Sequence, residues 1–223
     1  MKSNSSSNAF TDEYSTTYFF NSNDEAEVFK LIPILEDFVF FPTLTDEAFL
    51  QECFHVDFDP EGDGRKKDIM GVVYNEMKGA YSSPDDVLSR QILNSLFPDT
   101  TYAIESGGDP KVIPSLTYED FLAFHSKYYH PSNSYIYVYG DVDIDEMLEY
   151  LDKKYLCKYD YLEVDSEIQM QKPFDKPVDI TLDYSIAADQ DVENNTFLSY
   201  NVCIGDVLDP NMYRAFDVLN YAL

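Results

Sequence analysis

Residues 71–84 read GVVYNEMKGAYSSP, and this stretch joins two predicted helices through a turn. The first helix is expected to run from Lys67 through Glu76 to Tyr81, and the Ser-Ser-Pro that follows is typical of a second helix start. Within the first helix we predict Glu76 near the side that faces the protein interior. Burying a carboxylate is expensive unless it is paired or bound to a metal. Glu76 is therefore the first candidate for a functional residue.

Further helices are expected on both sides of this stretch. Residues 24–40 carry apolar side chains at helical spacing, although Pro33 falls inside the pattern. Thr117 and Asp120 have the spacing of a capping box, in which each side chain accepts a backbone N–H from the other residue. The remaining predicted helices cover 46–54 with Thr45 as the N-cap, 87–97, 118–129, 143–156 and 210–223.

Alternating side chains predict the strands. The clearest strand is SYIYVY at 134–139, and residues 195–204 alternate in the same way. Residues 159–192 contain Pro173 and Pro177, which suit a connector with an edge strand. Shorter strands are predicted within 8–20 and at 55–58, with a turn at 59–63. The order of elements predicts the α+β class, with an antiparallel-rich sheet and helices packed on one of its faces.

The composition limits the possible partners. The 223 residues are 44% hydrophobic, which is enough for one or two domains with real cores. The 15 Lys and Arg against 42 Asp and Glu give a formal net charge of -27. Such a surface repels nucleic acid and anionic membranes, so we expect neither as a partner, and it favours cationic partners or peptides. An acidic surface that serves only solubility is the alternative interpretation.

The cysteines and the start of the chain bear on the compartment. Cys53, Cys157 and Cys203 are far apart and form no CxxC pair, so we expect reduced, buried thiols of the kind found in the cytosol. The first residues have no apolar segment of the kind found in signal peptides. The expected compartment is the bacterial cytoplasm, or the mitochondrion if the N-terminus is truncated.

The histidines do not predict a metal site. His125 and His130 are five residues apart, so on one helix their side chains would point about 140° away from each other. The sequence contains neither HExxH nor HxxEH, whereas a catalytic zinc takes about three protein ligands. Glu76 is the one candidate ligand, and the alternative is a surface glutamate paired with Lys78.

A resemblance adds a specific interpretation. The segment GVVYNEMKGAYSSPDDVL and residues 102–142 resemble the presequence-protease branch of the insulinase-type, or pitrilysin-type, zinc metallopeptidases. Residues 8–20 resemble, more loosely, the strand pair that follows the catalytic helix of that family. The resemblance implies an incomplete LuxS/metallopeptidase-like α/β sandwich. Residues 1–158 would be the remainder of a first domain, 159–192 a connector with an edge strand, and 193–223 the truncated start of a second homologous domain.

The same resemblance implies roles for three residues. The Glu of the family's NEMKG segment is the third zinc ligand, and it corresponds to Glu76. Asn8 and Ala9 correspond to the edge strand to which a substrate peptide adds. The family hydrolyses short, unfolded peptides with a zinc-bound water and the Glu of HxxEH as the base.

Because HxxEH is absent from this sequence, we expect the catalytic base to lie outside the chain, and we expect this chain alone to bind no zinc and to be inactive. The expected partners are a short peptide substrate and the remaining part of the enzyme, or a complementary chain of the same family. One alternative is a non-catalytic, peptide-binding relative. Another is an acidic α+β domain with an unrelated role.

Overall fold

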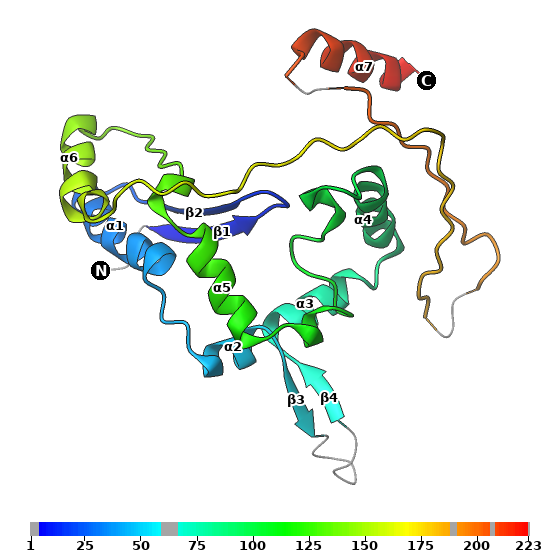
Figure 1. The fold of residues 1–223 in the computed structure, drawn as a ribbon, viewed down its shortest axis with the longest axis horizontal. Coiled ribbons are helices and arrows are strands. Elements are labelled where there is room, and N and C mark those ends of the chain that lie inside the picture. Colours follow the sequence, from blue (N-terminus) through cyan, green and yellow to red (C-terminus); the bar gives the residue numbers. More distant parts are fainter. Residues whose placement is uncertain (1–4, 59–66, 188–190, 206–207, 223) are drawn as a thin grey trace.

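The computed structural model describes residues 5–58, 67–187, 191–205 and 208–222, and it combines two separate β-hairpins with surrounding helices (Figure 1). Strands β1 (Ser6–Thr11) and β2 (Thr16–Asn21) form the first antiparallel hairpin. Strands β3 (His55–Phe58) and β4 (Lys67–Met70) form the second. The predicted turn at 59–63 lies outside the described residues. The predicted α+β class with antiparallel pairing is confirmed.

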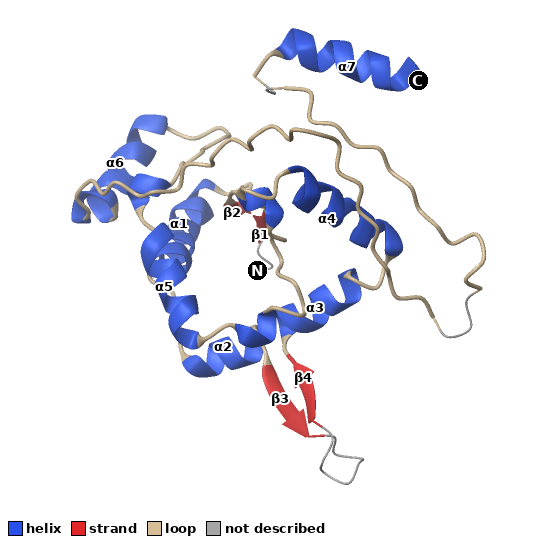
Figure 2. Cartoon of the chain, turned by 45° about the vertical axis from the view of Figure 1, so that its right-hand side comes forward, coloured by secondary structure: helices blue, strands red, loops and turns tan. Residues whose placement is uncertain are grey.

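Seven α-helices follow the chain order within the described residues. They are α1 (Glu25–Phe40), α2 (Asp46–Glu52), α3 (Val72–Ala80), α4 (Pro84–Leu96), α5 (Tyr118–Tyr128), α6 (Ile144–Lys154) and α7 (Pro210–Ala222). Four short 3-10 turns connect some of them, at Thr101–Ala103, Ile113–Ser115, Pro131–Asn133 and Leu156–Lys158. Both views show α7 at the end of a long extended connector, away from the other helices (Figures 1 and 2).

Local capping explains where several helices begin. The Asp24 side chain accepts from the Ala26 N–H at 2.9 Å at the start of α1, which then continues through Pro33. Thr45 accepts from the Ala48 N–H at the start of α2, as predicted. The predicted capping box is also present, because Thr117 accepts from the Asp120 N–H and Asp120 accepts from the Thr117 N–H. Each cap supplies partners for N–H groups that a helix start leaves unpaired.

A small hydrophobic core joins α1 to α6. Its buried members are Ile32 of α1, Met147 and Leu151 of α6, and Tyr155 just after α6. Phe20 of β2 packs against this cluster, so the core also anchors the first hairpin. The hairpin that carries the predicted substrate contacts is therefore fixed on the helical layer.

Four predicted elements differ in the structure. Lys67–Met70 is strand β4 instead of the start of a helix, because it pairs with β3, and α3 begins only after Gly71. The predicted strand at 134–139 has no strand partner among the described residues. The described parts of 159–192 and of 195–204 also form no strand. Alternation favours an extended backbone, but a strand forms only where a second segment supplies its hydrogen bonds.

The expectation of buried cysteines is wrong for two positions. The three thiols are free, but Cys157 and Cys203 are exposed and Cys53 is half-buried. Burial raises the pKa of the Cys53 thiol. Cys157 lies just after the last turn of α6, and Cys203 lies in a segment without strand pairing. Little of the protein packs on either thiol.

The buried carboxyl group of Glu36 in α1 is expected to make the stability of the protein depend on pH. Its side chain is 8% exposed, and its Oε2 has no hydrogen-bond partner within the described parts of the chain. Burial, with a smaller effect of the Asp37 charge, raises the pKa of Glu36 above its ordinary value of 4.5. The folded state therefore holds the proton more tightly than the unfolded state. This contribution to stability is complete below the unfolded value and declines as the pH rises through the raised folded pKa.

We expect Glu36→Gln to be more stable than the wild type at about pH 7 and nearly equal to it at about pH 4. Urea unfolding at both pH values measures the difference. Glu163→Gln, at an exposed position of the connector, is the control and should follow the wild type at both pH values. A Glu36→Gln effect of equal size at the two pH values would contradict the role of its ionisation.

Candidate functional site

Strand β1 carries Asn8 and Ala9 at the edge of a two-stranded sheet. β1 pairs with β2 on one side, and no other described strand pairs with its second side. The Ala9 N–H donates to the Asn8 Oδ1 at 2.8 Å, so a side chain already occupies this backbone donor. A peptide that added to this edge as a strand would have to displace that contact at Ala9.

The two residues fall on opposite faces of the hairpin. Asn8 is paired with Phe19 and Ala9 with Tyr18, and directly opposed residues share a face. Phe10 and Phe19 stack on the face of Asn8, with ring centroids 5.4 Å apart. The face of Ala9 is the one that carries Tyr18 toward α5, because the Tyr18 hydroxyl contacts Tyr129 just after that helix.

Glu76 lies on helix α3, as predicted, but its side chain is exposed. The expectation that it faces the interior is wrong because Met77, 6% exposed, occupies the buried side of α3. Successive helical residues are turned by about 100°, so a buried Met77 directs Glu76 away from the core. Its role as a metal ligand stays a prediction.

Two glycines fix the position of α3. A Cβ on Gly71 would lie 2.3 Å from the Cys53 carbonyl oxygen, so the chain passes this backbone closely just before α3 begins. A Cβ on Gly107 would lie 2.3 Å from the Met77 sulfur, so the loop at 106–110 packs directly on the buried side of α3. These contacts set where the helix, and with it Glu76, stands relative to α2 and the loop.

A hollow of about 240 Å³ lies at the first turn of α3, beside the second hairpin. Polar side chains reach it from α2, β3 and α3, while Glu76 does not line it. The His55 Nδ1 is 2.9 Å from the Leu50 carbonyl oxygen, so this ring nitrogen carries the proton and donates to the backbone. The residues that line it are Gln51, His55, Asp57, Met70, Gly71, Val72 and Asn75.

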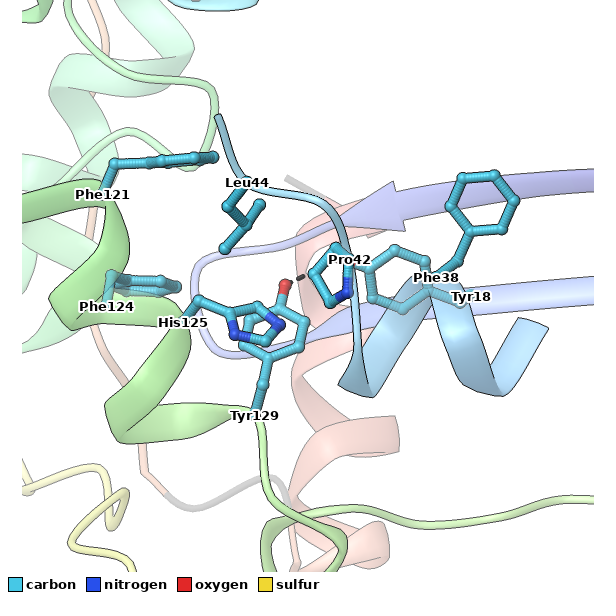
Figure 3. Close-up of a pocket in the computed structure, with 8 residues that line it drawn as sticks. All are labelled: Tyr18, Phe38, Pro42, Leu44, Phe121, Phe124, His125 and Tyr129. Carbon is cyan, nitrogen blue, oxygen red and sulfur yellow. Dashed lines mark hydrogen bonds between the residues drawn. The ribbon is translucent and has the colours of Figure 1, made fainter. Parts of the chain in front are cut away.

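A second hollow, of about 180 Å³, lies between β2, the end of α1 and α5 (Figure 3). Its lining is apolar and aromatic apart from one histidine and two tyrosine hydroxyls, and it consists of Tyr18, Phe38, Pro42, Leu44, Phe121, Phe124, His125 and Tyr129. Drug-sized ligands occupy pockets of roughly 300–1,000 Å³, so this volume suits one large apolar side chain. Sequence reasoning missed it because its residues come from three distant segments.

Hydrogen bonds fix the polar groups of this hollow. The hydroxyls of Tyr18 and Tyr129 are 2.7 Å apart, as the dashed line in Figure 3 shows. Burial, together with this hydrogen bond, raises the pKa of Tyr18 well above its ordinary range. The His125 Nε2 donates to the Val39 carbonyl oxygen at 2.9 Å, and its ring stacks on Tyr129. All three groups are engaged with one another or with backbone, which indicates a structural role.

The described residues do not form a zinc site by themselves. No three His, Cys, Asp or Glu side chains among them stand close enough to hold a metal ion. Because a catalytic zinc takes about three protein ligands, Glu76 on its exposed helix surface would need donors from elsewhere.

The chain is similar in sequence to a family of known peptidases. A family model described as "Peptidase M16 inactive domain" matches residues 115–223. Protein HypA of Clostridium perfringens is 45% identical over 218 residues, and presequence protease 1, chloroplastic/mitochondrial, of Arabidopsis thaliana is 41% identical over 199 residues. The chain belongs to the M16 peptidase family. The insulinase-type resemblance predicted from the sequence is thus confirmed.

This M16 chain spans about a fifth of the length of the curated relatives it matches. The alignment with HypA covers 97% of this chain and 22% of HypA, and the alignment with the Arabidopsis protein covers 87% and 18%. A solved M16-like peptidase from Alicyclobacillus acidocaldarius has the same fold over 76% of this chain and 34% of its own, with a TM-score of 0.56 and 22% identity. Among the described helices, none combines the length and apolar character needed to cross a bilayer.

Proposed function

We propose that this chain is part of a zinc-dependent M16 endopeptidase that degrades short, unstructured peptides, and that it is inactive alone. The similarity to presequence proteases over most of the chain supports the reaction class. In this proposal Glu76 is one zinc ligand, and the other ligands and the base come from outside the chain. Asn8 and Ala9, on the open edge of β1, contact the peptide. The division of the chain into a first domain (1–158), a connector with an edge strand (159–192) and the start of a second domain (193–223) is part of the same proposal.

The observation that carries the proposal is the place of Glu76 on a well-fixed helix. The Gly71 and Gly107 contacts fix α3 on its buried side, and the carboxylate stands on the accessible side. A ligand that must meet donors from another segment needs both a rigid helix and an uncovered side chain. The relatives include a bacterial protein, HypA, as well as mitochondrial presequence proteases, and the bacterial cytoplasm stays our proposal for the compartment.

A second candidate function is a non-catalytic M16 partner that binds peptide without cutting it. The family model that matches residues 115–223 is described as an inactive domain, which favours this candidate for the C-terminal half. Zinc content separates the two candidates, because only the first requires Glu76 to bind metal.

The test uses a chimera in which this chain replaces the stretch of Clostridium perfringens HypA that aligns with it. We expect the chimera to bind about one zinc per chain and to cleave a short unstructured peptide, and the isolated chain to do neither. Glu76→Gln in the chimera should lower zinc affinity at least about tenfold. Metal analysis after dialysis and a fluorogenic peptide assay measure both properties.

The matched control is Glu119→Gln, an exposed helical glutamate on α5, which should leave zinc content unchanged. Unchanged zinc in the Glu76→Gln chimera would refute the ligand role. A chimera that binds the peptide but holds no zinc and does not cleave would favour the non-catalytic candidate. One tight zinc in the isolated chain would contradict the proposed dependence on outside ligands.

A further inference from the structure

The proposed substrate edge and the proposed zinc ligand lie on different parts of the fold. Asn8 and Ala9 belong to the hairpin of β1 and β2, which packs on α1, whereas Glu76 belongs to α3, which packs on α2 and β4. A peptide bond held by the one and a metal held in part by the other react only at the correct spacing, since an error of about 1 Å can lower a rate roughly 100-fold. The contacts that set this spacing are therefore of functional interest.

The hairpin is held on the helical layer near its open end and in its middle. Phe20, near the open end, packs against the core that joins α1 to α6. The Tyr18 hydroxyl, on the residue opposite Ala9, contacts the hydroxyl of Tyr129. A hairpin that is held at these two points alone can still swing at its turn, residues 12–15.

An aromatic pair holds this turn. The Tyr14 ring lies 6.2 Å from the Tyr102 ring, centroid to centroid, with an angle of 58° between the planes. Tyr102 belongs to the 3-10 turn after α4, and its ring also lies 5.5 Å from that of Phe97. Tilted aromatic pairs at roughly 4.5–7 Å are favourable. The turn of the hairpin accordingly points toward α4 in Figure 1.

Tyr102 lies near the start of a stiff segment, residues 97–109. Backbone hydrogen bonds close successive turns along it, and they join Thr100 to Phe97, Ala103 to Thr100, Ile104 to Thr101 and Gly108 to Glu105. A segment with its backbone groups paired in this way resists bending more than an open loop does. A contact made at Tyr102 is therefore carried to the far end of the segment.

The far end of the same segment supports α3. Glu105 pairs with Arg90 of α4, whose guanidinium lies over the ring of Tyr81 at the end of α3. Gly107 lies against Met77 on the buried side of α3. The turn of the hairpin and the buried side of α3 thus rest on one short segment of chain.

We propose that Tyr102 is a positioning residue, which sets the spacing between the peptide-binding edge of β1 and Glu76 by holding the turn of the hairpin on the segment that supports α3. The inference rests on the proposed function, which assigns the peptide and the zinc to those two places. Tyr102 contacts neither of them and acts through the Tyr14 ring. Because the aromatic ring makes this contact, phenylalanine serves as well as tyrosine at this position, whereas an aliphatic residue does not.

A distance measurement tests the contact without any use of activity. The isolated chain, with its three cysteines replaced by alanine, carries spin labels at Thr17→Cys of β2 and Lys78→Cys of α3, both exposed positions. Electron paramagnetic resonance measures the distribution of the distance between the two labels. We expect Tyr102→Leu to widen this distribution at least about twofold, because the turn of the hairpin is released, and Tyr102→Phe to leave it unchanged.

Tyr14→Ser removes the same contact from the side of the hairpin. Tyr14 is 61% exposed, so this variant leaves the core intact and should widen the distribution as Tyr102→Leu does. Tyr161→Leu, on the connector and 83% exposed, is the matched control and should not widen it. Widening by Tyr102→Leu but not by Tyr14→Ser would overturn the proposal, since Tyr102 would then act on α4 alone. An unchanged distribution in both variants would overturn it as well.

Kinetics of the HypA chimera test the consequence for the reaction. Tyr102→Leu should lower kcat at least about tenfold, with KM and zinc content within about twofold of those of the unsubstituted chimera. Tyr102→Phe should keep at least about half of kcat. A raised KM with kcat unchanged would mean that Tyr102 touches the peptide, and lost zinc would mean that it supports the ligands directly. Either result, or an unchanged kcat in Tyr102→Leu, would contradict the positioning role.

The two measurements separate this inference from the proposed function. An unsubstituted chimera that holds no zinc or does not cleave the peptide counts against the proposed function. The label distances in the isolated chain depend on neither property, so they decide the role of the Tyr102 contact by themselves.

Discussion

Replacing Gly71 by alanine is expected to lower the free energy of unfolding by about 3 kcal/mol. The added Cβ would lie 2.3 Å from the Cys53 carbonyl oxygen and 2.7 Å from the Phe54 Cα, and both are backbone atoms that cannot rotate away. The φ of +155° at Gly71 is, in addition, one that L side chains rarely adopt. The chain must therefore separate α3 from the end of α2 to accommodate the methyl group. Urea unfolding followed by circular dichroism measures the loss.

Gly79→Ala is the matched control because it lies on the same helix. An added Cβ there meets no atom within 4 Å, and alanine favours a helix over glycine. We expect the free energy of unfolding to rise by up to about 1 kcal/mol. If Gly71→Ala and Gly79→Ala had similar effects, the close approach at Gly71 would not be what positions α3.

Removing the Glu105 carboxylate is expected to cost about 3 kcal/mol of unfolding free energy. The Arg90 Nε lies 2.9 Å from the Glu105 Oε2, and the two side chains are 17% and 15% exposed. The guanidinium also lies over the Tyr81 ring, 4.3 Å from its centroid, at the end of α3. Glu105→Ala would leave the largely buried positive charge of Arg90 without its carboxylate partner. The Arg90 Nη1 already has no hydrogen-bond partner among the described residues, so the guanidinium would lose one of its few polar contacts. Thermal and urea unfolding measure the effect.

The control is the ion pair between Lys153 and Glu149 on α6, where both side chains are more than half exposed. Glu149→Ala should change the free energy of unfolding by less than about 0.5 kcal/mol, since water screens this pair. The double variant Arg90→Met with Glu105→Leu should be more stable than Glu105→Ala alone, because it leaves no unpaired charge. Equal losses from Glu105→Ala and Glu149→Ala would show that burial of the Arg90 pair is unimportant.

The sequence predicted best those features that a few neighbouring residues determine. The start of α1 at Asp24 and the capping box of Thr117 and Asp120 need only a side chain and an N–H two or three residues away. Such contacts form within one turn of chain, so their pattern is visible without the rest of the protein. The family resemblance has the same local origin, because it rests on two continuous segments.

The candidate site depended more on contacts that the sequence does not show. Glu76 was correctly predicted to lie on a helix, but only the packing of Gly107 on Met77 decided that Met77 is buried and Glu76 exposed. The hollow at Tyr18 requires β2 to meet the end of α5, where Tyr129 is 111 positions from Tyr18. One-dimensional periodicity says which residues share a face, but not which distant element covers that face.

The strands show the same division most clearly. Alternation alone predicted an extended backbone at residues 134–139 and 195–204, but it could not determine whether these segments pair with another strand, and among the described residues they do not. Lys67–Met70, with a weaker pattern, became a strand because β3 lies beside it. A helix satisfies its backbone hydrogen bonds from within its own segment, whereas a strand obtains them from a partner. The sequence by itself therefore determined that these helices form, whereas the tertiary structure decided where α3 begins and which extended segments became sheet.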